Sequence, residues 1–125
     1  MTSKKRSGFE TRVSGALEGS GFLYEPFKVP YVTSGTYTPD WAMGDVLVEA
    51  KGWFRPGDIK KYKAINDSIV AQGLYELVFL LQYPNKPVRK GAQLTMAGWC
   101  NKHKISWFSD PDTLVSYVVQ NQGGG

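Results

Sequence analysis

The sequence contains few of the residues that disulfide-bonded and zinc-stabilised domains need. Cys100 is the only cysteine and His103 the only histidine among 125 residues. A single cysteine excludes an internal disulfide, and it also excludes a zinc site built from cysteine ligands. We interpret Cys100 as a small buried apolar residue and His103 as structural, because no partner for it is identifiable.

Long apolar segments are also missing. The longest apolar run, Leu77–Leu81, is too short to cross a bilayer, and the charged stretch Met1–Arg6 leads into no apolar signal segment. These absences predict a soluble, unexported protein. Hydrophobic residues still make up 42% of the chain, which is too many for a disordered protein. The length predicts a single domain over residues 1–125, with residues 1–6 as a basic arm and residues 121–125 as a flexible tail.

Charge is unevenly distributed along this basic chain, whose formal net charge is +4 at pH 7. Several acidic residues lie between Glu10 and Glu49. The basic residues cluster at Lys4–Arg6, Arg55–Lys63, Lys86–Lys90 and Lys102–Lys104. A locally acidic region within a basic protein is what a metal site facing a phosphate backbone requires.

Apolar periodicity predicts a mixed α/β domain, with a central sheet flanked by helices. The predicted helices run from Ser7 to Gly19, from Pro56 to Val70, from Ala92 to Lys102 and from Pro111 to Val119. The predicted strands are Tyr24–Val32, Tyr37–Trp41, Val46–Lys51, Tyr75–Gln82 and Ile105–Phe108. Pro26 and Pro30 favour an edge position for the first strand. We expect the second and third strands to form a hairpin around Met43-Gly44-Asp45.

The main chemical signal is Pro39-Asp40 followed by Glu49-Ala50-Lys51. Because strand side chains alternate, Glu49 and Lys51 should lie on one face and Ala50 on the other. A hairpin partner ending at Asp40 would bring a second carboxylate beside Glu49. Two carboxylates and the main-chain carbonyl of Ala50 form an oxygen-rich site suited to Mg²⁺ or Mn²⁺. Lys51 could then orient the attacking water and stabilise charge on a phosphate.

Glu10 is a candidate third carboxylate, on the first predicted helix. It could complete a second metal position about 4 Å from the first. The segment Ser7–Glu10 also has the form of a capping box, with Ser7 as the N-cap, so capping alone would explain Glu10. Asp40 likewise has a simple alternative as a turn residue after proline. Glu49 and Lys51 could form no more than an exposed ion pair, which contributes little stability.

The Asp, Glu-x-Lys pattern resembles that of the PD-(D/E)XK nuclease superfamily. The surrounding segments, in the same order, resemble phage endonuclease I of the T7 type, a family of Holliday junction resolvases, over roughly residues 6–110. The segments that carry this resemblance are Ser7–Glu10, Lys28–Val32, Thr36–Asp40, Val48–Gly52 and Cys100–His103.

The resemblance implies a restriction-endonuclease-like core that hydrolyses phosphodiesters of branched DNA, in the cytoplasm of a phage-infected bacterium. Asp40 and Glu49 match the family's metal-binding acids, Lys51 its catalytic lysine and Glu10 its helix-borne acid. The resemblance also implies a domain-swapped homodimer, in which the first helix of one subunit completes the site of the other. Glu10 would then act in trans.

Two departures from the family pattern concern DNA binding and the dimer. The stretch Thr33-Ser34-Gly35 is shorter at the point where the two lobes of the family dimer are bridged. Val115–Gly125 holds no lysine or arginine where the family is strongly basic, which predicts weaker or less structure-selective DNA binding.

Basic residues near the motif are candidates for phosphate contact, although a solvated helix face or a disordered arm would also explain them. These candidates are Lys4, Lys5, Arg6, Arg12, Lys28, Arg55, Lys60, Lys61 and Lys63. The tryptophans, Trp41, Trp53, Trp99 and Trp107, are interpreted as core residues, with Trp53 the one most open to a base-stacking role because it follows the site.

Two other functions remain compatible with the same residues. One is a nicking or non-specific duplex endonuclease that uses the same active site. The other is a non-catalytic DNA-binding protein on a nuclease scaffold, which the intact set of Asp40, Glu49 and Lys51 disfavours.

Overall fold

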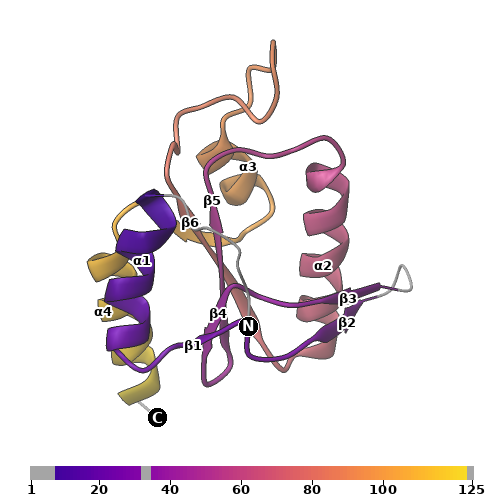
Figure 1. Ribbon diagram of the computed structural model, residues 1–125. Coiled ribbons are helices and arrows are strands. Elements are labelled where there is room, and N and C mark those ends of the chain that lie inside the picture. Colours follow the sequence, from indigo (N-terminus) through magenta and orange to yellow (C-terminus); the bar gives the residue numbers. More distant parts are fainter. Residues whose placement is uncertain (1–7, 32–34, 124–125) are drawn as a thin grey trace, which may run out of the picture.

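A five-stranded mixed sheet lies between two groups of helices in the computed structural model, which describes residues 8–31 and 35–123 (Figure 1). The elements are α1 (Gly8–Gly19), β1 (Leu23–Tyr24), β2 (Val29–Tyr31), β3 (Gly35–Tyr37), β4 (Trp41–Met43), β5 (Val46–Lys51), α2 (Asp58–Gln72), β6 (Glu76–Leu81), α3 (Met96–Lys102), β7 (Ser106–Phe108) and α4 (Pro111–Gly123). The predicted mixed α/β class, with a central sheet flanked by helices, is confirmed.

The strand order β1-β4-β5-β6-β7 places the most apolar strands in the middle of the sheet. β5 pairs with β6 and β6 with β7 in parallel, through the crossover helices α2 and α3, whereas β1, β4 and β5 pair antiparallel. Central strands buried on both faces need apolar residues at nearly every position, which explains the run Leu77–Leu81. β2 and β3 form a separate two-stranded ribbon near α2, where the Gln72 amide donates to the carbonyl of Pro30 at 3.1 Å.

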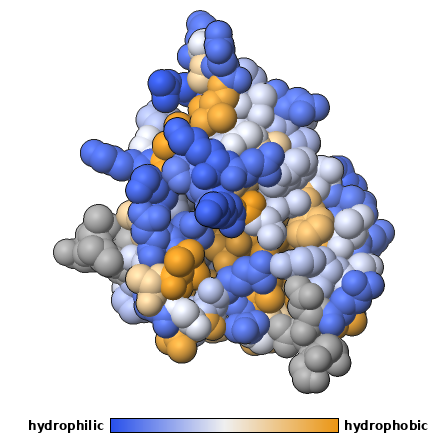
Figure 2. Space-filling view, turned by 180° about the vertical axis from the view of Figure 1, so that it is seen from behind, coloured by the Kyte–Doolittle hydropathy of each residue, from blue (hydrophilic) through white to orange (hydrophobic). Residues whose placement is uncertain are grey.

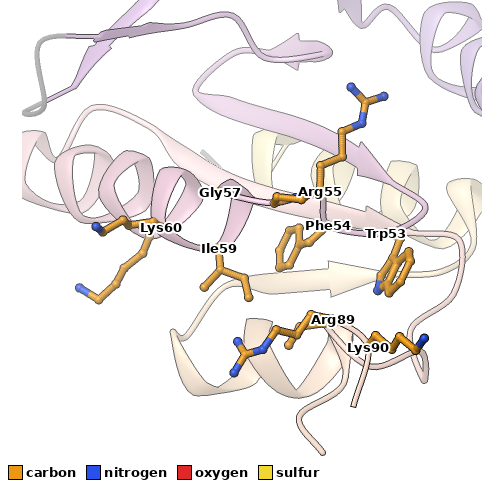
Figure 3. Close-up of a pocket in the computed structure, with 11 residues that line it drawn as sticks. Trp53, Phe54, Arg55, Gly57, Ile59, Lys60, Arg89 and Lys90 are labelled. Carbon is orange, nitrogen blue, oxygen red and sulfur yellow. The ribbon is translucent and has the colours of Figure 1, made fainter. Parts of the chain in front are cut away.

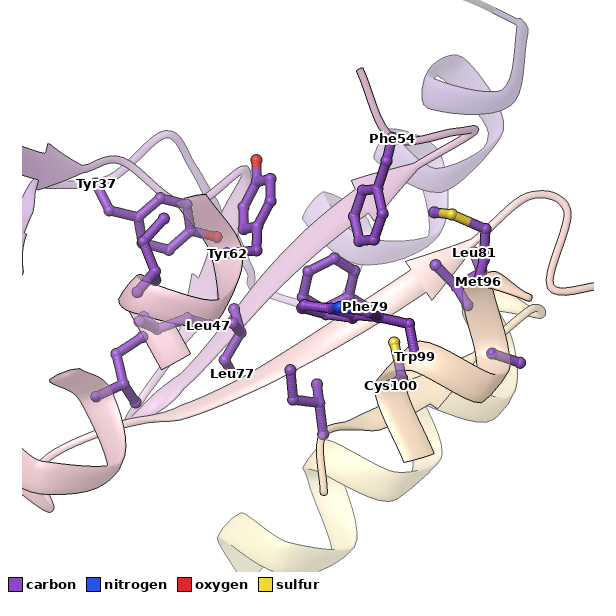
Figure 4. Close-up of a cluster of buried hydrophobic side chains, with 14 of the residues drawn as sticks. Tyr37, Leu47, Phe54, Tyr62, Leu77, Phe79, Leu81, Met96, Trp99 and Cys100 are labelled. Carbon is purple, nitrogen blue, oxygen red and sulfur yellow. The ribbon is translucent and has the colours of Figure 1, made fainter. Parts of the chain in front are cut away.

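Two hydrophobic clusters cover the two faces of the sheet. On one face, α1 and α4 pack on Val46, Val48 and Ala50 of β5. On the other face, α2 and α3 enclose Leu47, which belongs to the larger cluster (Figure 4). The residues of β5 therefore alternate between the faces as predicted. As a consequence, Glu49 emerges among the aromatic side chains on the α2 side.

Aromatic rings fill the α2 side of the core next to the end of β5. Phe54 contacts the ring of Trp99 at 5.0 Å and that of Tyr62 at 6.1 Å, and the Tyr62 ring lies 5.4 Å from that of Phe79. Figure 4 shows these rings gathered between β5, β6 and the two helices. Such contacts fix the start of α2 against the sheet, so that Tyr62 is held close to β5.

The predicted core roles of Trp41, Trp99 and Cys100 are confirmed. Trp41 and Trp99 are 1% and 2% exposed, and Cys100 is free and buried. Burial raises the pKa of the Cys100 thiol to about 12, which makes it unreactive at neutral pH. His103 packs its ring 4.7 Å from that of Trp99.

The hairpin exists, but its first strand differs from the prediction. Strand β3 ends at Tyr37 and β4 begins only at Trp41, so Asp40 precedes the hairpin strand instead of ending it. Pro39 has no N–H to donate to a neighbouring strand, which interrupts the predicted Tyr37–Trp41 strand. The predicted strand Tyr24–Val32 is similarly divided into β1 and β2.

Helix α2 is shifted by two residues from its predicted bounds, and helices α3 and α4 depart further from theirs. Helix α3 begins at Met96 rather than Ala92, because the Thr95 side chain caps it by accepting from the Gly98 N–H at 3.0 Å. Helix α4 continues past Val119 to Gly123, so residues 121–123 of the expected tail are helical. In the part of the chain that the structure describes, no helix is long and apolar enough to span a membrane.

Candidate active site

Glu49 is a buried carboxylate held by two tyrosine hydroxyls. Tyr37 donates to its Oε1 at 2.6 Å and Tyr62 donates to its Oε2 at 2.9 Å. Only 5% of Glu49 is exposed, so the alternative of an exposed strand ion pair is wrong. Burial and the Glu49 charge raise the pKa of both tyrosines, which therefore stay protonated as donors.

Asp40 lies beside this carboxylate. The main-chain N–H of Ala50 donates to Asp40 Oδ2 at 2.9 Å, which fixes the aspartate against the end of β5. The Asp40 main-chain carbonyl in turn accepts from Glu25 N–H at 2.7 Å. Although the strand boundary was predicted incorrectly, the two acids meet, because Asp40 directly precedes the strand that pairs with β5.

Lys51 is placed between two acidic groups. Its Nζ lies 3.8 Å from Glu49 Oε2 and 3.4 Å from Asp58 Oδ2, and it is 4.8 Å from the centre of the Tyr62 ring. Asp58 is in the first turn of α2 and also accepts from the Arg55 N–H at 2.9 Å. The ammonium group is thereby held at the mouth of the site instead of extending into solvent.

The negative charges of Asp40 and Glu49 repel each other. Burial raises the pKa of Glu49 to about 8, and the Asp40 charge adds to that effect against the lowering by the tyrosine hydroxyls and Lys51. Burial also raises the pKa of Asp40. A buried acid with a raised pKa has too little compensating positive charge nearby, and a bound cation would supply it.

A cavity of about 440 Å³ brings the predicted residues together. It is lined by Phe9, Glu10, Asp40, Glu49, Ala50, Lys51, Gly52, Trp53, Arg55 and Gln82. Glu10 reaches it from α1 of the same chain, and its charge contributes to the raised pKa of Asp40. Within a single chain the structure therefore joins Glu10 to the other acids. Ser7, the expected N-cap partner of Glu10, lies outside the described residues.

The oxygen donors present suit a hard divalent cation. Asp40 and Glu49 supply carboxylates, Ala50 lines the same cavity, and Mg²⁺ and Mn²⁺ prefer oxygen ligands. Among residues 8–31 and 35–123, no three His, Cys, Asp or Glu side chains are arranged to hold a metal together. The donor set therefore fits a metal held by two acids and a main-chain oxygen, with water completing the coordination.

The model of the family "Phage endonuclease I" matches residues 1–120 of this chain. The chain belongs to the phage endonuclease I family. Endonuclease I of Escherichia phage T7 is 30% identical over 135 residues, an alignment that covers 96% of this chain and 89% of the T7 protein. The predicted family is confirmed, and with it the class of enzyme, an endonuclease.

The predicted phosphate-binding cations of this endonuclease lie on several elements. Arg55 lines the acidic cavity, and Lys60, Lys61 and Lys63 are exposed on α2. Lys63 forms an ion pair with Asp67 at 2.8 Å, which reduces its availability to a phosphate. Arg12 and Lys28 are also exposed, and Lys4, Lys5 and Arg6 lie outside the described residues.

Sequence reasoning missed four residues that shape the site. Tyr37 and Tyr62 hold Glu49, Asp58 holds Lys51, and Gln82 lines the cavity from the end of β6. Only Asp58 and Tyr62 show a recognisable pattern in the sequence, because their spacing of four residues places them on one face of α2. That spacing gives no indication that the face points at β5.

Proposed function

We propose that this endonuclease cuts four-way junctions and other branched DNA by metal-dependent hydrolysis at the acidic cavity. The observation that carries the proposal is the convergence of Asp40, Glu49 and Lys51 at the end of β5, in a cavity rimmed by Arg55. Buried acids in a basic protein suit a cation that meets a phosphate. The T7 relative is named an endonuclease, which supports the same reaction class.

The chain's own residues have separate roles in this reaction. Asp40, Glu49 and the Ala50 carbonyl would hold Mg²⁺ or Mn²⁺, which acts as a Lewis acid on the phosphate and acidifies bound water. Lys51 donates hydrogen bonds from Nζ to the attacking water and to the phosphate oxygens that gain charge. Glu10 lines the same cavity as Asp40, where it would bind water or a second cation. Cleavage leaves 5′-phosphate and 3′-hydroxyl ends.

We expect the enzyme to cut a four-way junction faster than linear duplex of the same sequence. Gel assays with Mg²⁺ on a junction, a nicked duplex, a linear duplex and supercoiled plasmid measure the ratio. Equal rates on the junction and the linear duplex would establish the alternative, a nicking or non-specific endonuclease with the same site. Binding of all four DNAs without cleavage of any would establish the other alternative, a non-catalytic DNA-binding protein on a nuclease scaffold.

The family resemblance also predicts a swapped homodimer, whereas a single chain already brings Glu10 to its own site. Mixing two inactive variants, Glu10→Gln and Lys51→Ala, distinguishes the arrangements. If Glu10 acts in trans, a mixed dimer contains one intact site, and nicking of the junction should return. If Glu10 acts in cis, both sites of the mixed dimer are defective and no activity returns.

The control for this mixing experiment is a pair of variants that damage the same part of the site, Glu49→Gln with Lys51→Ala. Those two residues lie on one strand, so no exchange of α1 rebuilds a site from them. The dimer itself is measured by light scattering of each mixture before the assay. A monomeric mass at assay concentration would contradict the predicted dimer.

A further inference from the structure

A second cavity of about 660 Å³ lies next to the acidic one, and the proposed reaction does not use it. It runs between the start of α2 and the segment before α3 and is lined by Trp53, Phe54, Arg55, Pro56, Gly57, Ile59, Lys60, Lys63, Val88, Arg89 and Lys90. Figure 3 shows Trp53, Phe54 and Ile59 extending toward the segment that carries Arg89 and Lys90. Trp53 and Arg55 line both cavities, so the two are neighbours.

The interior of this cavity is apolar and its rim is cationic. Phe54 and Val88 are buried at its floor, with 5% and 3% of their surface exposed. Among the residues that the structure describes, five basic side chains line it and no acidic side chain does. Seen from behind, the segment before α3 protrudes at the top of the molecule (Figure 2). Hydrophilic side chains cover this segment, and apolar surface shows between them. An apolar interior with a cationic rim complements a flat base attached to phosphates.

Trp53 lines this cavity and is held by two contacts, although 40% of it is exposed. Its indole N–H donates to the carbonyl of Pro87, and the Lys86 Nζ lies 4.3 Å from the ring centre. Lys86 is not one of the residues that line the cavity. A tryptophan fixed in this way provides a stacking surface at little cost in conformational entropy.

We propose that this cavity binds an unpaired nucleotide of the DNA substrate, stacked on Trp53 over the apolar floor, with its flanking phosphates on Arg55, Arg89 and Lys60. The inference rests on the proposed function of the acidic cavity. The cavity would act as a binding site for unpaired bases next to the cleaved phosphodiester. A base held at Trp53 places the adjoining backbone toward Arg55 and the carboxylates. Branch points and bulges offer such bases, whereas continuous duplex does not.

Photocrosslinking tests the proposal without any cleavage. A duplex with one unpaired 5-iodouracil and a matched duplex with the same base paired are bound to the wild-type protein in EDTA, irradiated and mapped by mass spectrometry. We expect a crosslink at Trp53 or Phe54 that forms at least about tenfold more with the unpaired base. Equal yields from both duplexes, or crosslinks only at aromatic residues outside the cavity, would overturn the proposal.

Affinities of variants for the same duplexes give a second measurement. Trp53→Ala should weaken binding of the bulged duplex about fivefold or more, and Trp53→Phe should retain most of it, because a base stacks on either ring. Tyr83→Ala is the matched control, since its ring also contacts Lys86, at 5.3 Å, but does not line the cavity. An equal loss of affinity with Tyr83→Ala would show that the effect comes from the segment before α3 as a whole. That result would overturn the role of the cavity.

Two further outcomes distinguish a failure of the base site from a failure of the proposed endonuclease mechanism. If crosslinking succeeds but Mg²⁺ supports no cleavage, the base site stands and the proposed endonuclease mechanism fails. If cleavage succeeds without the crosslink, the base site fails alone. Free dTMP is the competitor, and we expect millimolar amounts to be needed for displacement because it carries only one of the two flanking phosphates. Displacement at micromolar dTMP would show a mononucleotide site and overturn the assignment to the DNA strand.

Discussion

Replacing Lys51 by alanine is expected to lower kcat for junction cleavage by at least about 10²-fold, while junction affinity changes only a few-fold. The Lys51 Nζ lies 3.8 Å from Glu49 Oε2 at the mouth of the cavity. In the proposed reaction, the phosphate oxygens gain charge there. A cation in that position acts on the transition state more than on bound DNA, so kcat should fall rather than binding. Single-turnover cleavage in Mg²⁺ and a mobility shift in EDTA measure the two effects.

Lys61→Ala is the matched control for this variant. Both lysines approach the ring of Tyr62, Lys61 at 5.4 Å and Lys51 at 4.8 Å, but Lys61 is exposed and does not line the acidic cavity. Its loss should leave kcat within a few-fold of wild type and alter affinity at most. A Lys51→Ala enzyme that cuts at the wild-type rate would refute the proposed mechanism.

The central set of acids and lysine could be predicted because it depends on local rules. Glu49 and Lys51 share a face through the alternation of a single strand, and Asp40 directly precedes the neighbouring strand of the same hairpin. An error of a few residues in the strand boundary did not matter, since Asp40 still precedes β4. The family was likewise readable from short ordered segments, and the comparison with known proteins confirmed it.

The environment of those residues could not be predicted, because it depends on contacts between distant elements. Tyr37 comes from the separate ribbon and Tyr62 from α2, and each reaches a different oxygen of Glu49. The second cavity depends in the same way on the segment before α3, where the sequence predicts the helix to start at Ala92. Val88 and Arg89 line the cavity from the segment that precedes the actual start of this helix at Met96. Periodicity gives no information about either arrangement.

Glu49→Gln is expected to abolish metal-dependent cleavage and, in the absence of metal, to stabilise the protein at alkaline pH. Lewis-acid assistance is worth several kcal/mol, so losing it should reduce the rate by about 10³-fold. The glutamine can keep both tyrosine contacts, because its carbonyl accepts from Tyr37 and its amide can donate to the oxygen of Tyr62. It lacks the buried charge, which is the source of the stability change.

The direction of the pH effect follows from the raised pKa of Glu49. The folded protein holds this proton up to about pH 8, whereas the unfolded chain releases it near the ordinary value of 4.5. Between those values the folded state binds more protons, so wild-type stability falls as pH rises, and above pH 8 the loss is complete. Melting curves in EDTA from pH 5 to 9 should therefore show a fall in Tm for wild type that is smaller for Glu49→Gln. Added Mg²⁺ should raise the wild-type Tm most above pH 8, where no proton competes for the carboxylate. Parallel Tm curves for the two proteins would refute the buried charge at Glu49.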